Sequence, residues 1–108
     1  MNRKVLILNV AKSDFREIKS YVRTQFGESV WKEVNQEFQN TIRNIGLNAE
    51  AGQRIEELGE LGQDNFKTRL VRQTKIVYAF DEREVLVHMF IHEKRDFRTH
   101  LLKRLLSM

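Results

Sequence analysis

The chain has 108 residues, and its 19 basic and 15 acidic side chains give a formal net charge of +4. This length predicts one domain over residues 1–108, since single domains commonly run to about 100–150 residues. The chain contains no cysteine, which excludes disulfides, cysteine nucleophiles and thiolate zinc sites and leaves the cytoplasm as the default location. No apolar run approaches the ~20 residues of a membrane span. The N-terminus is basic and briefly apolar but lacks a small-residue cleavage site, so we expect neither a signal peptide nor a membrane partner.

The charge is unevenly distributed along the sequence. Residues 1–64 carry nine basic and ten acidic side chains, whereas residues 65–108 carry ten basic and five acidic ones. This asymmetry predicts that the C-terminal part meets an anionic partner, either nucleic acid or an acidic protein segment. A solvated basic surface without a partner is the alternative.

The first elements are a strand and a helix. The aliphatic run Val5–Val10 predicts a strand. Ala11–Phe26 then changes to a helical period, with Ser13 as the expected N-cap and Gly27 as the terminating residue in a left-handed conformation. The apolar face of this helix is formed by Phe15, Ile18, Tyr21 and Val22.

A second helix is expected over Glu28–Ile45, with Gly46 as its stop signal. Because almost nothing joins the two helices, they should fold back as an antiparallel hairpin whose apolar stripes need a sheet to cover them. Trp31 and Phe38, together with Tyr21 of the first helix, are expected in that core. Residues 47–64 predict a loop with a short helical turn around Ile55–Leu58.

The remainder of the sequence changes to a period of two. Residues 66–71, 76–80 and 85–92 predict three consecutive antiparallel strands, with a polar turn at Asp81–Glu84. Asp96 is the expected cap of a final helix with a leucine-rich stripe. The predicted order is therefore β-α-α-β-β-β-α, an α+β domain with an N-terminal strand, an antiparallel helical hairpin on an antiparallel sheet, and a C-terminal helix.

This order resembles the RelE/ParE toxin superfamily, whose members pack a helical hairpin on a twisted antiparallel sheet. The ParE branch is the closer match on three segments. Residues 11–18 (Ala-Lys-Ser-Asp-Phe-Arg-Glu-Ile) followed by Tyr21 are similar to the family's opening, and Phe26-Gly27 is followed by a long second helix. The ending Phe90-Ile91-His92 with Arg98-Thr99-His100-Leu101 looks like the tail of ParE chains.

The resemblance implies the toxin of a type II toxin–antitoxin module of the kind that stabilises plasmids. Such a toxin is silenced by a cognate antitoxin in a hetero-oligomeric complex. ParE toxins arrest growth by inhibiting DNA gyrase, whereas RelE toxins cut mRNA on the ribosome. A degenerate toxin that retains only antitoxin binding is a third possibility. Because one fold serves two targets, the target has to be inferred from the residues of the site and not from the fold.

Lys67, Arg69, Lys75 and Arg95 are the basic residues at positions that match the RelE nuclease site. Lys67 and Arg69 are two apart on one strand and should project from the same face, where Lys75 and Arg95 could join them. In the nuclease interpretation these side chains stabilise the charged transition state, and His100 serves as the acid or base. In the binding interpretation they dock an acidic partner and no residue is catalytic.

Further contacts with a partner are expected from the C-terminal helix, through Phe97, Leu101 and Leu105. The antitoxin is expected to place a segment in the groove between the helical hairpin and the sheet. His88 and His92, four apart on one strand, should face the same way, but no third histidine or carboxylate pair accompanies them. We therefore expect no metal and no other cofactor, and we interpret the chain as a gyrase-binding protein rather than an enzyme.

Overall fold

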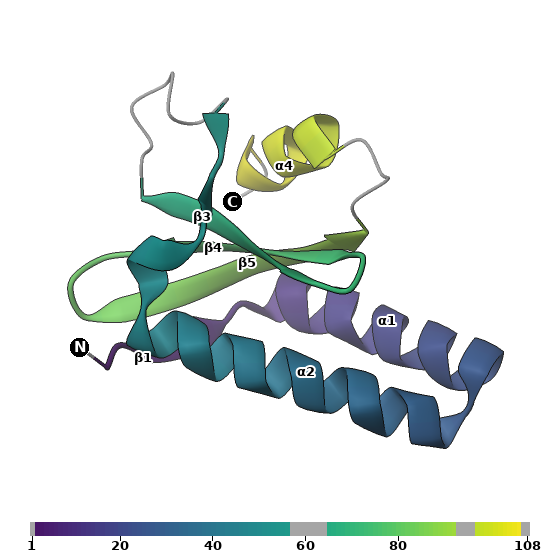
Figure 1. Cartoon of the computed structure of the whole chain (residues 1–108). Helices are drawn as coiled ribbons and strands as arrows, with labels where there is room; N and C mark the ends of the chain where they lie inside the picture. The colour runs from purple at the N-terminus through teal and green to yellow at the C-terminus, as the bar shows by residue number, and fades with distance from the viewer. Residues whose placement is uncertain (1, 57–64, 93–96, 107–108) are drawn as a thin grey trace.

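The computed structural model describes residues 2–56, 65–92 and 97–106, and it arranges helices on both sides of a sheet (Figure 1). The sheet has five strands in the order β1-β5-β4-β3-β2, which confirms the α+β prediction. The elements, in chain order, are β1 (Lys4–Ile7), α1 (Asn9–Phe26), α2 (Glu28–Leu47), the 3₁₀ helix η1 (Ala49–Ala51), β2 (Gln53–Arg54), β3 (Phe66–Val71), β4 (Thr74–Phe80), β5 (Glu84–His92) and α4 (Phe97–Leu106).

The helical hairpin forms as predicted, with Gly27 as the only residue between α1 and α2. Gly27 has φ 94° and ψ 171°, which is an extended conformation at positive φ rather than the expected left-handed one. This region is essentially restricted to glycine. Its N–H donates to the Arg23 carbonyl and its carbonyl accepts from Trp31, so one residue ends the first helix and begins the second.

The start of α1 differs from the prediction. β1 ends at Ile7, and the helix begins at Asn9, two residues before the expected Ala11. Leu8 is the N-cap residue, so the prediction of Ser13 as the cap is wrong. The physical reason is pairing with the sheet: the Leu8 N–H donates to Val87 O while the Leu8 carbonyl already accepts from Lys12 N. The last bond to the sheet and the first bond of the helix therefore meet at one residue.

The end of α2 also differs, because the helix runs through Gly46 to Leu47. Gly46 is buried and faces the N-terminal segment. Its carbonyl accepts a hydrogen bond from Arg3 N at 2.8 Å, and a Cβ at this position would lie 3.0 Å from Val5 Cγ2. The glycine therefore lets β1 approach the helix, and it does not act as a stop signal.

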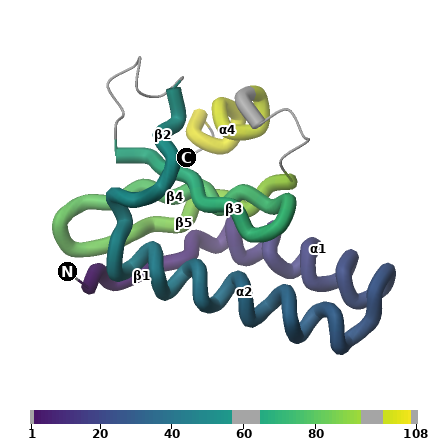
Figure 2. The backbone as a smooth tube through the Cα atoms, viewed as in Figure 1, coloured from purple at the N-terminus to yellow at the C-terminus, as the bar shows by residue number. Residues whose placement is uncertain are grey.

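The sheet contains two features that the period of two did not predict. β1 pairs with β5 in parallel, with Val5 opposite Val85, whereas all other pairs are antiparallel. The short strand β2 pairs with β3 at the opposite edge. From the end of α2 the chain passes along that edge towards the side of the sheet that carries α4 (Figure 2). Residues 57–64, which include the second half of the expected helical turn, and Asp96 lie outside the described residues.

Each face of the sheet has its own hydrophobic core. The face towards the hairpin buries aromatic and aliphatic side chains, among them the predicted Trp31 and Phe38. Its buried residues are Ala11, Trp31, Val34, Phe38, Ile45, Ala49, Val71, Ile76, Tyr78, Val85, Val87 and Phe90. The opposite face, covered by α4, buries Ile55, Phe66, Val77, Ala79, Met89, Ile91 and Leu101. Tyr21 is not part of either core, because 61% of it is exposed, so its prediction as a core residue is wrong.

A bulge in β5 changes which side chains of the strand face each core. Val77 pairs with Met89 while Tyr78 pairs with Val87, so His88 has no directly opposite residue. An extra residue changes the alternation of side chains. Val85 and Val87 face the hairpin before the bulge, and Phe90 faces it afterwards.

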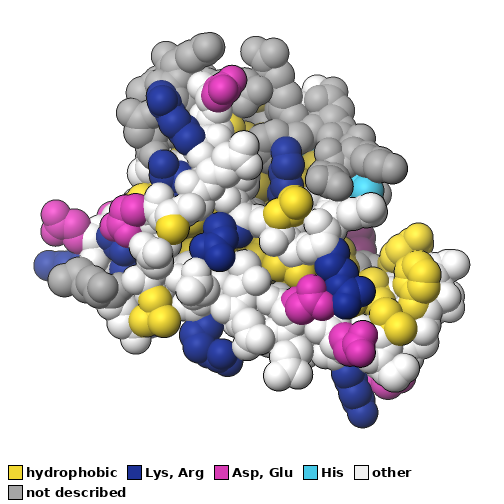
Figure 3. All heavy atoms as spheres, in the orientation of Figure 1, with side chains coloured by type: hydrophobic (Ala, Val, Ile, Leu, Met, Phe, Trp, Pro, Cys, Tyr) yellow, Lys and Arg dark blue, Asp and Glu magenta, His cyan; other side chains and the backbone are white. Residues whose placement is uncertain are grey.

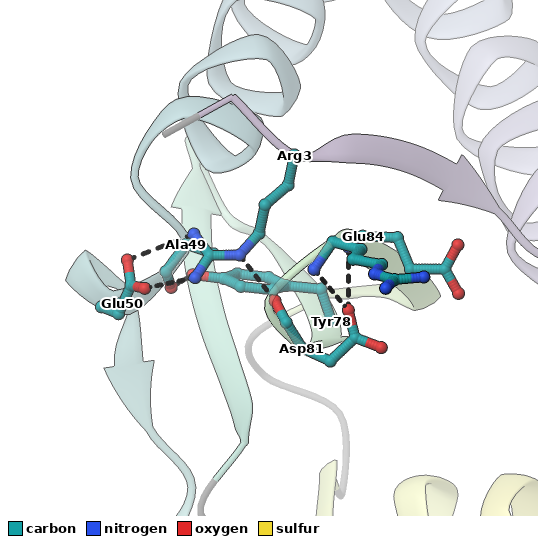
Figure 4. Close-up of polar contacts among 7 residues, drawn as sticks. Arg3, Ala49, Glu50, Tyr78, Asp81 and Glu84 are labelled. Atoms are coloured by element: carbon teal, nitrogen blue, oxygen red, sulfur yellow. Dashed lines mark hydrogen bonds and ion pairs between the residues drawn. The ribbon is translucent and has the colours of Figure 1, made fainter.

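A polar network fastens the end of the molecule where β1, η1 and the β4–β5 turn meet (Figure 4). The Tyr78 hydroxyl donates to Ala49 O at 2.7 Å. A Cβ on Gly52 would lie 2.1 Å from the same hydroxyl oxygen, so only glycine fits there. The guanidinium of Arg3 donates to Asp81 O at 2.6 Å and pairs with Glu50. Asp81 Oδ1 in turn accepts from the backbone N–H groups of Arg83 and Glu84, which confirms the predicted turn.

Candidate partner-binding groove

The hairpin extends beyond the sheet (Figure 1). A groove opens between the two helices and the sheet near this end. The groove has a volume of about 870 Å³. It is bounded by the two helices, the β3–β4 turn and the end of β5. We call it the hairpin groove. Its lining includes Asp14, Glu17, Ile18, Tyr21, Val22, Phe26, Val30, Val34, Phe38, Val71, Arg72, Gln73, Thr74, Phe90 and His92.

The floor of the hairpin groove is apolar. Ile18 and Val22 come from α1, while Val30, Val34 and Phe38 come from α2. These residues continue the stripe that packs against the sheet nearer β1. Figure 1 shows that the far ends of α1 and α2 extend past the sheet, so the stripe continues beyond the strands that cover it.

Two exposed aromatic side chains form one wall of the groove. Tyr21 is 61% exposed and Phe26 is 59% exposed, and their rings lie edge to face with centroids 6.3 Å apart. Figure 3 shows hydrophobic side chains gathered at this far end of the hairpin. Exposed apolar groups that gather beside a concavity are typical of protein-binding sites, whereas isolated ones are ordinary.

The facing wall is the β3–β4 turn, where Arg72 adopts a positive φ of 53°. A non-glycine residue in this region is uncommon and strained. The Arg72 side chain crosses to α2 and donates to both carboxylate oxygens of Glu37, with the shortest contact at 2.7 Å. This hydrogen bond holds the pKa of Glu37 below its usual value. The turn is thereby tied to the hairpin, which fixes the width of the groove.

The inner end of the groove is closed by polar groups. Asp14 of α1 accepts a hydrogen bond from Phe90 N and pairs with Arg104 of α4 at 3.0 Å. His92 Nε2 lies 3.1 Å from Gln73 Oε1. The groove therefore combines an apolar floor, an aromatic wall and a rim of mixed charge.

The predicted basic residues do not share one face. Lys67 is opposite Tyr78 and Arg69 is opposite Ile76 in the β3–β4 register, so the two share one face, as predicted, and that face is towards the hairpin. Arg69 donates to Asn44 Oδ1 at 3.0 Å. Lys75 is opposite Leu70 and Ile91, which places it on the α4 face and not beside Lys67 and Arg69.

His100, the acid or base of the nuclease alternative, is exposed on α4. The position of α4 separates it from Lys67 and Arg69 by the thickness of the sheet (Figure 1). Arg95 lies outside the described residues.

The C-terminal helix places its predicted partner-binding residues differently from the expectation. Leu101 is only 2% exposed and Leu105 packs against the same core, so Leu101 is not available to a partner. The side chain of Phe97 lies outside the described part of the chain. The exposed leucines of α4 are Leu102 and Leu106.

The two strand histidines do not face the same way, contrary to the prediction. The bulge places His88 on the α4 face, where its ring lies 5.2 Å from that of Phe66. His92 lies after the bulge on the hairpin face. Within the described residues, no group of three or more metal-binding side chains comes together.

The sequence contained one signal for the groove that its interpretation missed. Tyr21 and Phe26 lie five residues apart beside the single glycine that joins the helices, and large apolar side chains at the tip of a hairpin are the furthest from its covering sheet. None of the helices in the described ranges combines the length and apolarity that a bilayer crossing requires. No protein-family model matches the chain, and no curated protein matches it at a significant level.

Proposed function

We propose that this chain is a cytoplasmic toxin of a type II toxin–antitoxin module, similar to ParE, which arrests growth by binding DNA gyrase. In this proposal a cognate antitoxin neutralises it within a hetero-oligomeric complex. The observation that carries the proposal is the hairpin groove, because its lining suits a protein segment better than a reacting small molecule. The resemblance of residues 11–21 and of the C-terminal tail to ParE chains supports the branch.

The groove fits an amphipathic segment of a protein partner. Such segments bury apolar side chains in a groove and leave their polar side towards the rim. The apolar floor would receive the former, and Glu17, Arg72 and Gln73 surround the opening with both charges and an amide. Tyr21 and Phe26 are side chains of the kind that dominate binding energy at protein interfaces. We therefore assign the antitoxin segment to this groove.

The distribution of basic residues favours binding over catalysis. A transition state is stabilised by groups that converge on one reacting centre. Lys67 and Arg69 lie on the hairpin face, whereas Lys75 and His100 lie on the α4 side. Arg69 is also engaged with Asn44 of α2. These four residues therefore do not surround a common point, as a nuclease would need.

Purified protein tests the proposal directly. It should inhibit DNA supercoiling by gyrase and should leave mRNA intact on programmed ribosomes. Expression without antitoxin should give filamentous cells with DNA damage. Single alanine variants at Lys67 and Arg69 should lower potency gradually, because binding energy is spread over an interface. Ribosome-dependent transcript cleavage that disappears in Arg95→Ala, with gyrase unaffected by the wild type, would instead establish the RelE-like activity.

A further inference from the structure

The outer surface of α1 carries a row of basic side chains, although acidic residues outnumber basic ones by one over residues 1–64. Lys12, Arg16, Lys19 and Arg23 follow one another at steps of four, three and four residues, so they lie on one side of the helix. All four are exposed. With a rise of 1.5 Å per residue, the row is about 16 Å long. We call it the α1 basic row.

The acidic residues of α1 lie on a different side of the helix. Asp14 is turned to the sheet edge, where it pairs with Arg104, and Glu17 lines the hairpin groove. Hydroxyl groups accompany the basic row instead: Ser20 and Thr24 line a shallow depression together with Arg16, Lys19 and Arg23, and Glu28 of α2 closes one end of its lining. Arg23 also pairs with Glu28 at 2.6 Å, but both side chains are half exposed, so this pair is weak and can be exchanged.

We infer that the α1 basic row binds the phosphate backbone of double-stranded DNA. Lysine, arginine, serine and threonine side chains are the usual donors to phosphate oxygens. A duplex carries one negative charge for every ~1.7 Å of its axis, so a row of this length faces several phosphates at once. The depression beside the row gives the backbone a place to lie.

The shape of the row favours DNA over RNA. The major groove of B-DNA is wide enough to admit an α-helix, whereas that of A-form RNA is deep and too narrow for side chains to read. A straight row along an 18-residue helix therefore suits the backbone at the edge of a DNA groove. This inference is independent of the proposed toxin activity, because it concerns the purified chain and duplex alone.

The test is the salt dependence of binding to a fluorescent DNA duplex of about 20 base pairs, measured by anisotropy from roughly 50 to 200 mM salt. Four phosphate contacts predict a slope of about −3.5 for log K against log salt concentration. The variant Arg16→Gln/Lys19→Gln should reduce this slope to about −2 and weaken binding at low salt at least tenfold. Both positions are exposed on the helix surface, so the variant should keep the wild-type circular dichroism spectrum.

The matched control is Arg83→Gln/Lys103→Gln, which removes the same charge from exposed positions in the β4–β5 turn and on α4. It should leave the slope unchanged. Equal losses in the two double variants would mean that only net charge matters and would overturn the site. An RNA duplex that binds as tightly as DNA, with the same loss in Arg16→Gln/Lys19→Gln, would overturn the assignment to DNA. Unaltered binding of DNA by Arg16→Gln/Lys19→Gln would overturn the α1 basic row as the binding site.

Discussion

Arg104 of α4 donates hydrogen bonds to both carboxylate oxygens of Asp14 of α1, at 3.0 and 3.1 Å, around the free edge of β5. Strand β1 covers β5 only as far as Val87. Beyond that point, Phe90 N donates to Asp14 and His88 O accepts from Arg104. One ion pair therefore satisfies a bare strand edge and joins the helices on the two faces of the sheet.

Asp14→Ala should lower the free energy of unfolding by about 1–3 kcal/mol, because it removes the acceptor of the Phe90 N–H and the carboxylate that pairs with Arg104. Urea denaturation measures the change. Arg23→Ala is the matched control, since its pair with Glu28 is half exposed, and it should cost no more than about 1 kcal/mol. A loss of equal size in the two variants would contradict the special role of the strand edge.

Gly52→Ala should destabilise the fold by about 1–3 kcal/mol, because the added Cβ meets the Tyr78 hydroxyl and the Cβ of Lys67. Tyr78→Phe alone should cost about 1 kcal/mol through the lost hydrogen bond to Ala49. The double variant should be more stable than the sum of the two losses predicts, since removal of the hydroxyl relieves the nearest clash. If thermal denaturation shows that the two losses of stability are additive, the Tyr78 hydroxyl is not the contact that makes Gly52→Ala unfavourable.

Stability should increase as pH rises towards about pH 7 because of His88. Burial, and then the charge of Arg104, hold the pKa of His88 below its ordinary value. The unfolded chain therefore binds the proton more readily than the folded one, so stability is fully present above the unfolded pKa of about 6.5 and is lost as pH falls. His88→Phe should flatten this part of the profile. An unchanged slope in His88→Phe would contradict this assignment.

Tyr21→Ser should weaken capture of the antitoxin by about tenfold or more, because an exposed aromatic beside the hairpin groove is expected to anchor the partner. The product of the adjacent gene is the partner to titrate. Val10→Ser removes an apolar side chain that is 47% exposed on the same helix but outside the groove lining, so it should change affinity little. Equal affinities for the two variants and the wild type would place the antitoxin elsewhere.

Substitutions of Leu101 and Leu106 in α4 should differ clearly in their effect on the free energy of unfolding. Leu101→Ala should cost about 2–5 kcal/mol, because Leu101 fills the core on the α4 face. Leu106 is 85% exposed, so Leu106→Ser should change the free energy of unfolding by less than about 0.5 kcal/mol. If gyrase inhibition depends on this helix, Leu106→Ser is the variant that should reduce it without unfolding the protein.

The sequence by itself determined the class of elements and their order. The helical period of Phe15, Ile18 and Val22 predicted α1, and the alternation from Phe66 onwards predicted three antiparallel strands, because local periodicity follows from which side of an element is buried. The helical hairpin followed from a single glycine between two helices. The parallel pairing of β1 with β5 and the edge strand β2 could not be predicted, since pairing between strands far apart in the sequence leaves no local pattern.

The tertiary structure decided where side chains meet. One extra residue at His88 placed His88 and His92 on opposite faces of the sheet. The β3–β4 register likewise placed Lys75 on the face opposite to Lys67. All of these residues fitted a simple alternation in the sequence. Net charge was equally uninformative about α1, because Asp14 and Glu17 offset two of its four cations in a count but lie on another side of the helix in space. The hairpin groove exists because the two helices extend past the sheet. This depends on the angle between the helices and the strands, which only the tertiary structure determines.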